Sequence, residues 1–297
     1  MCCHNSQQKA SFDTQDGIYD LAWSEVHENQ LVSVSGDGSV KLWDVTLDQF
    51  PIHKWREHQR EVYSADWNNL RKDIFATASW DQTIKIVSCF PLCWLKLRLK
   101  SITQWSPERP ASMSTIHAHS ACVYAALFSP HSPDILASCS TDGYLNLWDL
   151  RLPAASPPVS SILAHPAEVL TLDWNKYIPN TIATGSIDRS VKLHDLRMPN
   201  RPAVLSALTG HAYAVRKVAW SPHQPTTLAS ASYDMTVRIW EVGGLTQKMT
   251  GLPPEVLARG MHDGHTEFVN GVAWSLFEAG VIASCAWDQE VHAWKAI

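Results

Sequence analysis

A pattern of about 45 residues recurs six times along this 297-residue chain and constrains its fold more than any other feature. Each copy ends in a short alternating stretch after an aspartate, as in "SGDGSVKLWDV", "STDGYLNLWDL" and "SYDMTVRIWEV". Spacings of 44, 61, 46, 46 and 54 residues separate the aspartates Asp37, Asp81, Asp142, Asp188, Asp234 and Asp288. One such unit cannot bury both of its faces, so the pattern predicts units that stack on one another.

Other polar residues recur at fixed places within the copies. A hydroxyl stands four residues before each aspartate, at Ser33, Thr77, Ser138, Thr184, Ser230 and Ser284. A histidine lies upstream in five copies, at His58, His119, His165, His211 and His265. Six residues after the aspartate stands a tryptophan or, once, a histidine: Trp43, Trp148, His194, Trp240 and Trp294.

This pattern resembles the WD repeat, in which each unit supplies four antiparallel strands to one blade of a β-propeller. The resemblance extends from Ser11 to Ile297 and implies an all-β propeller with six recognisable blades, in a family that usually has seven. "SFDTQDGIYDLAWSE" starts in mid-repeat, so we expect that an N-terminal blade is missing. We expect residues 1–10 to be irregular, and no strand that would complete the last blade is evident after Trp294.

A histidine, a hydroxyl and an aspartate in every copy also suggest a hydrolytic triad. Nucleophilic machinery is not needed six times over, so we predict a structural role and no catalytic residue. The resemblance implies a buried hydrogen-bonded network. Leaving one of its polar groups unpaired would lower the stability of the fold by about 1–3 kcal/mol. Its expected members are His58, Asp81, His119, Asp142, Trp148, His165, Asp188, His211, Asp234, Trp240, His265, Asp288 and Trp294.

The second copy is interrupted. Val87 stands where a tryptophan is expected, the next suitable one is Trp105, and removing residues 87–104 restores the spacing. We expect a poorly packed insertion at 87–104 and favour a retained intron, because Val-Ser and Gln104 can be encoded by intron borders. A functional loop and a membrane-surface element formed by "WLKLRLK" are the alternatives. Sequencing the transcript decides between them.

Composition narrows the function. A net charge of −5 argues against a nucleic-acid partner, and the chain holds no apolar run long enough to span a membrane. Seven cysteines and the lack of a secretory signal favour a reducing compartment. Cys89 and Cys93 lack a second ligand pair, so we predict neither a metal site nor a cofactor.

"QDGIYDLAWSE", "EHQREVYSADWN", "ASWDQTIKI" and "GHAYAVRKVAWSPH" together resemble the import receptors for the type-2 peroxisomal targeting signal. This resemblance implies a cytoplasmic receptor that shuttles to the peroxisome. Its implied partners are the N-terminal targeting peptide of matrix enzymes such as 3-ketoacyl-CoA thiolase, a peroxin co-receptor and a docking complex. Such a peptide forms an amphipathic helix with an apolar stripe and a cation.

The repeat also predicts the surface that receives the peptide. Residues that open the innermost strands should surround the channel mouth: Tyr19, Asp20, Glu61, Tyr63, Tyr124, Glu168, Arg216, Phe268 and Asn270. Residues just before the structural aspartates should join them: Trp80, Thr141, Ile187, Tyr233 and Trp287. We expect Asp20, Glu61 and Glu168 to bind the cation, and Trp80, Tyr233 and Trp287 to receive leucines.

Plainer interpretations remain open. An aromatic before the turn aspartate can simply cover a blade edge, and a single acid can simply be solvated. "WDLR" at Trp148–Arg151 and "HDLR" at His194–Arg197 resemble the motif with which substrate receptors of cullin-type ubiquitin ligases dock their adaptor. A histone-binding or general scaffold role is the third alternative.

Overall fold

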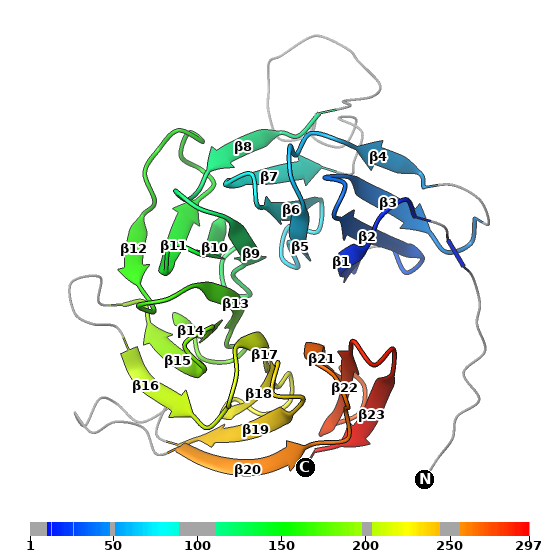
Figure 1. The fold of residues 1–297 in the computed structure, drawn as a ribbon. Helices are drawn as coiled ribbons and strands as arrows, with labels where there is room; N and C mark the ends of the chain where they lie inside the picture. The colour runs from blue at the N-terminus through cyan, green and yellow to red at the C-terminus, as the bar shows by residue number, and fades with distance from the viewer. Residues whose placement is uncertain are drawn as a thin grey trace.

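The chain folds into a ring of antiparallel β-sheets, each forming one blade of a propeller (Figure 1). The structure, a computed structural model, describes residues 11–12, 14–25, 27–47, 51–88, 111–197, 204–243 and 256–296. Within these ranges every regular element is a strand, so the expected all-β, WD-type propeller of six blades is confirmed. No helix in the described ranges has the length and apolarity that crossing a membrane requires.

Blades 1 to 3 each have four strands in sequential order. Blade 1 contains β1 (Ile18–Trp23), β2 (Gln30–Ser35), β3 (Val40–Asp44) and β4 (His53–Trp55). Blade 2 contains β5 (Val62–Trp67), β6 (Ile74–Ser79), β7 (Thr83–Ser88) and β8 (Ser114–His117). Blade 3 contains β9 (Val123–Phe128), β10 (Ile135–Ser140), β11 (Tyr144–Asp149) and β12 (Ser160–Leu163).

Blades 4 and 5 repeat this order, and the described part of blade 6 has three strands. Blade 4 contains β13 (Val169–Trp174), β14 (Thr181–Ser186), β15 (Ser190–Asp195) and β16 (Val204–Thr209). Blade 5 contains β17 (Val215–Trp220), β18 (Thr227–Ser232), β19 (Val237–Val242) and β20 (Val256–His262). Blade 6 contains β21 (Val269–Trp274), β22 (Val281–Ala286) and β23 (Val291–Lys295).

The hydrophobic core lies between the blades. Ile74 and Ile84 of blade 2, for example, share one buried cluster with Val123 and Leu136 of blade 3. Both faces of an inner blade are covered in this way, which explains why β6 and β14 are buried along their whole length. Such strands contain small and β-branched residues because side chains from both neighbouring blades must fit against them.

The strand interrupted in the sequence continues further than expected. β7 includes Val87 and Ser88, and Val87 pairs with Phe75 and is buried in the same cluster as Trp55. The first two residues of the expected insertion therefore belong to the blade, while residues 89–110 and Trp105 lie outside the described residues. Where the chain is described again, the Ser112 backbone N–H and hydroxyl bind the Glu57 carboxylate at 2.5 and 2.6 Å.

Candidate peptide-binding face

The recurring polar residues meet inside the blades. In blade 5, His211 Nδ1 lies 2.8 Å from Asp234 Oδ2, and His211 Nε2 lies 2.7 Å from Ser230 Oγ. Trp240 Nε1 donates to the same hydroxyl at 2.8 Å. A carboxylate only accepts, so Nδ1 carries the imidazole proton; Nε2 then accepts from the hydroxyl, and the hydroxyl accepts from the indole.

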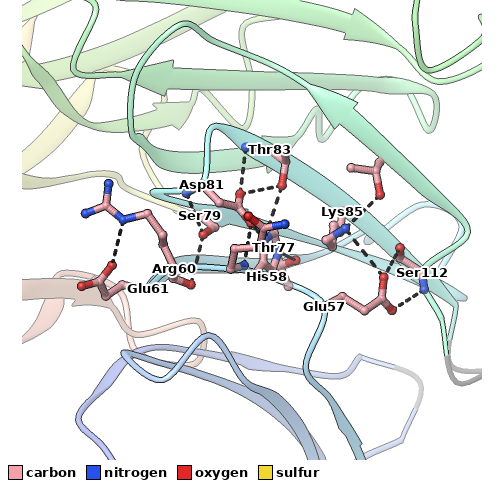
Figure 2. Close-up of polar contacts among 12 residues, drawn as sticks. Glu57, His58, Arg60, Glu61, Thr77, Ser79, Asp81, Thr83, Lys85 and Ser112 are labelled. Atoms are coloured by element: carbon pink, nitrogen blue, oxygen red, sulfur yellow. Dashed lines mark hydrogen bonds and ion pairs between the residues drawn. The ribbon is translucent and has the colours of Figure 1, made fainter.

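The imidazole–carboxylate and imidazole–hydroxyl contacts recur in blades 2, 3, 4 and 6 at 2.8–2.9 Å, through His58–Asp81, His119–Asp142, His165–Asp188 and His265–Asp288. Burial alone would raise the pKa of Asp81, but hydrogen bonds from His58 and Thr83 outweigh it and hold that pKa well below its ordinary value. Figure 2 shows this group at the centre of blade 2. Each of these carboxylates thus joins the loop before the innermost strand to the turn between the second and third strands of its blade.

The fourth member of the network varies. Trp148 donates to Ser138 at 2.9 Å, and His194 Nε2 lies 2.8 Å from Thr184 Oγ1 in place of an indole. Burial lowers the pKa of His194 to about 3, so its ring is neutral. The structure does not bring Trp294 into the network, because its indole N–H has no hydrogen-bond partner among the described residues.

A backbone hydrogen bond joins the two sets of residues that were expected at the channel mouth. The residue before the structural aspartate donates to the carbonyl of the residue that precedes the innermost strand, as in Trp80 to Glu61 (3.0 Å) and Trp287 to Phe268 (3.1 Å). Cys122 and Thr141 are joined in the same way, as are Glu168 and Ile187 and also Ala214 and Tyr233. The start of the innermost strand and the turn before the aspartate are therefore held side by side in blades 2 to 6.

A β-bulge near the start of the innermost strand determines the direction of one side chain in that strand. Where β5 pairs with β6 the register shifts between Val62 and Ser64, which leaves Tyr63 as the extra residue. The same shift occurs at Tyr19 in β1 and Arg216 in β17. Bulges turn a side chain out of the regular alternation, which explains why these residues gather at the mouth.

A packed aromatic cluster, which we call the blade 1–3 cluster, lies on one side of the mouth. Tyr63 stacks between Tyr19 (4.3 Å between ring centroids) and Trp80 (4.8 Å), and it meets Tyr124 edge-on at 5.0 Å. Arg216 reaches from blade 5 and lies over both Tyr63 (5.4 Å) and Tyr124 (5.8 Å). Burial raises the pKa of Tyr124 to about 12 and that of Tyr63 well above its ordinary value, so these two phenols remain neutral at physiological pH.

A second cluster, the blade 5–6 cluster, is more open. Tyr233 and Phe268 lie 5.0 Å apart, and Trp287 lies 5.4 Å from Phe268. Trp287 is 61% exposed, and no cation covers these rings among the described residues. This cluster offers an apolar surface to a ligand.

Two of the three expected carboxylates have partners of their own within the chain. Asp20 accepts the N–H groups of Leu21 (3.0 Å) and Ala65 (3.1 Å), so it bridges blades 1 and 2. Glu61 instead pairs with its neighbour Arg60 at 3.7 Å, at one end of the group in Figure 2. The joint site of these acids for the cation of the peptide stays a prediction.

The two arginines of the ligase-type motif have local partners. Arg151 Nε lies 2.8 Å from Asp149, and Arg197 Nε lies 2.9 Å from Asp195. Both side chains are more than half exposed, at 70% and 58%. This arrangement neither joins them to the channel mouth nor distinguishes a docking motif from a local ion pair.

The repeats match the family described as WD domain, G-beta repeat, at residues 6–44, 49–88, 111–149, 156–195, 203–241 and 258–295. The chain belongs to this WD-repeat family.

The chain is also similar to proteins named peroxisomal targeting signal 2 receptor. It is 39% identical to the Saccharomyces cerevisiae receptor over 160 residues, which are 48% of this chain and 41% of that protein. It is 38% identical to the Homo sapiens receptor over 129 residues (43% and 34%) and 54% identical to the Dictyostelium discoideum receptor over 78 residues (26% and 25%). The chain thus spans between a quarter and about two fifths of the length of these relatives, and the resemblance to type-2 signal receptors is supported on that part.

Sequence reasoning missed Arg60, which lies 5.7 Å from the Trp80 ring while it pairs with Glu61. Arg216 was expected at the mouth, but its contact with the blade 1–3 cluster was not. The signal for Arg60 was its place beside Glu61. No local signal could have indicated that Arg216 crosses to blades 2 and 3.

Proposed function

We propose that this protein is a cargo receptor for import into peroxisomes, which binds the N-terminal type 2 targeting peptide of matrix enzymes such as 3-ketoacyl-CoA thiolase. The observation that carries the proposal is the similarity to receptors named for that signal, at 38–54% identity over the aligned parts. Those relatives are receptors by name, which agrees with a chain whose repeated carboxylates and imidazoles are used by the scaffold.

The proposed binding surface is the channel mouth. The blade 5–6 cluster receives leucines, because exposed aromatic rings lose unfavourable hydration when an apolar side chain covers them. Glu61 or Glu168 pairs with the basic residue of the peptide, and Glu61 then exchanges its contact with Arg60 for one with the ligand. A surface ion pair at 3.7 Å contributes little to stability, so breaking the contact with Arg60 costs little free energy.

Partners and location follow from the same proposal. A peroxin co-receptor covers the bound peptide, and a docking complex then receives the assembly at the peroxisome. The receptor itself shuttles between cytoplasm and peroxisome.

A titration with a fluorescent peptide from the N-terminus of a thiolase tests the proposal. Trp287→Ala and Glu61→Lys should each weaken binding at least about tenfold, the first by removing an apolar anchor and the second by placing a cation opposite the peptide's own. The folded fraction should not change, since Trp287 is 61% exposed and the Glu61 side chain, 32% exposed, has only a surface ion pair.

Phe277→Ala is the matched control, because this aromatic is 96% exposed and follows the opposite end of β21. It should bind the peptide like the parent. Equal affinity of the parent, Trp287→Ala and Glu61→Lys would reject the mouth as the site, and no binding by the parent in the presence of co-receptor would reject the function.

A further inference from the structure

Blades 5 and 6 depart from the repeat at three neighbouring places, one in blade 5 and two in blade 6. Register equates His262 of β20 with Trp55, Ile116, Ile162 and Leu208, since each faces the same position of the adjoining third strand. His292 stands two residues before Trp294, where other blades have Lys41, Lys85, Asn146, Lys192 and Arg238. Glu290 replaces a hydroxyl that is Ser39, Thr83, Ser190 or Thr236 in four other blades.

These three side chains form a hydrogen-bonded chain. His262 Nε2 lies 2.9 Å from His292 Nδ1, and His292 Nε2 lies 2.9 Å from Glu290 Oε2. Because the carboxylate only accepts, Glu290 holds the His292 proton on Nε2 and leaves a lone pair on Nδ1 that points at His262. A carboxylate that fixes the tautomer of an imidazole in this way is the usual outer partner of a metal-bound histidine.

The surroundings hold the two rings in place. His262 stacks on Trp294 at 4.7 Å and 16°, and His292 stacks on His265 at 4.0 Å and 10°. His265 itself is not available as a ligand, because Asp288 and Ser284 engage both of its nitrogens. The ligand nitrogens of the three histidines nevertheless lie within 4.8 Å of one another, so the site is compact.

We propose that His262 and His292 form a binding site for a late first-row divalent cation, represented by zinc, between the outer strand of blade 5 and the third strand of blade 6. Two nitrogens about 2.0 Å from a tetrahedral ion lie about 3.3 Å apart, so the present 2.9 Å has to widen only slightly. On binding, the His262 proton resides on Nδ1 and its Nε2 lone pair joins the His292 Nδ1 lone pair on the ion. Water completes the coordination, since the His292 side chain is 24% exposed.

The expected consequence is a link between two blades. The ion binds only when β20 and β23 are in register, so it stabilises the folded chain in proportion to its occupancy. Imidazole ligands select zinc, copper or nickel over magnesium and calcium, which prefer oxygen.

The test uses the full chain, freed of metal with a chelator and titrated with zinc by calorimetry and by thermal denaturation. The parent should bind zinc and melt at a higher temperature with it. His292→Lys and His262→Leu restore residues that other blades carry at these positions, so they should fold, lose at least about tenfold in affinity and lose the zinc-dependent thermal shift.

Two further variants keep the outcome decisive. Glu290→Thr changes an exposed side chain to the residue of blades 2 and 5, and it should weaken zinc binding about tenfold without affecting folding. His117→Gln, at an exposed histidine on β8 outside the cluster, should bind zinc like the parent. The proposal is overturned if the parent does not bind zinc, or if binding persists unchanged in His292→Lys, His262→Leu and Glu290→Thr.

Discussion

The blades inside the ring and the two at its ends use the same sequence pattern in different surroundings. Trp174 of blade 4 is 3% exposed, whereas Trp23 at the same place in blade 1 is 54% exposed. Val191 of β15 is fully buried, whereas its counterpart Val291 of β23 is 72% exposed. In Figure 1 the two exposed faces belong to β1 and β23, on either side of the opening in the ring.

This difference shows that the apolar face of a blade is buried by the blade next to it. Strand pairing within blade 1 is as regular as in blade 4, with the same shift of register near the start of the inner strand. The sheet therefore forms from its own hydrogen bonds and its own repeat, but its apolar face gains stability only when another blade covers it.

The largest effect that tests this comparison is the loss of an indole at the end of an inner strand. Trp174→Ala should lower the free energy of unfolding by about 3–5 kcal/mol, because a buried side chain and its 3.1 Å hydrogen bond to the Leu127 carbonyl are both lost. Trp23→Ala should lower it by less than about 1 kcal/mol, since that side chain is mostly exposed already. Denaturant unfolding of both variants measures the difference.

Equal losses in the two variants would mean that Trp23 is covered in solution. The exposed faces of β1 and β23 would then be covered by a partner in solution. The difference in burial between inner and end blades would hold only for the chain without that partner.

Much of the fold could be predicted from the sequence because the six copies of the repeat share the same pattern. Recurrence of the hydroxyl, histidine, aspartate and tryptophan predicted the number of blades, but it placed Val87 in the insertion whereas the structure places it in β7. Exposure of Trp23 and Leu21 was not predictable from the local pattern, since "IYDLAW" and "VLTLDW" read alike and only the neighbouring blade differs.

A second test concerns the effect of burial on a carboxyl group that lies between inner blades. Asp66 of β5 lines a cavity of about 100 Å³ with Asp173 and Lys176, and burial raises its pKa from the ordinary 3.8 to about 7. Its carboxylate accepts the Phe128 N–H at 2.7 Å, while Lys176 lies nearer to Asp173, at 2.7 Å. The corresponding residue of blade 1 is the uncharged Ala22.

The sign of the pH dependence follows from the raised pKa. Between about pH 4 and pH 7 the folded chain keeps the Asp66 proton while the unfolded chain releases it, so stability falls as pH rises through this window, by up to about 1.4 kcal/mol per pH unit. Asp66→Asn removes this contribution, and its melting temperature should fall less than that of the parent between pH 5 and pH 7. Asp16→Asn, at an exposed acid of blade 1, is the control and should follow the parent; identical pH profiles for Asp66→Asn and the parent would contradict the enclosure.

The candidate site was predictable in position but not in its contacts. The position of a residue within the repeat predicted which residues lie around the mouth. In the structure, bulges at Tyr19, Tyr63 and Arg216 turn these side chains toward it. It could not predict that Asp20 turns to the backbone of blade 2 or that Arg216 covers Tyr63, because both contacts join blades that are separate in the sequence. Departures from the repeat, such as His262 and His292, were present in the sequence as a signal but became meaningful only when the structure joined them.

The smallest effect compares the same hydroxyl in an inner and an end blade. Ser230 of blade 5 serves both His211 and Trp240, whereas Ser284 of blade 6 serves His265 alone and the Trp294 N–H has no partner among the described residues. Ser230→Ala leaves two buried nitrogens unpaired and Ser284→Ala leaves one, so the first should lose about 1 kcal/mol more than the second. Both hydroxyls are buried, hence the volume change is the same and the difference isolates the indole contact. If both variants lose the same stability, the indole hydrogen bond adds nothing to an inner blade, and the difference between blades 5 and 6 lies only in how their apolar faces are covered.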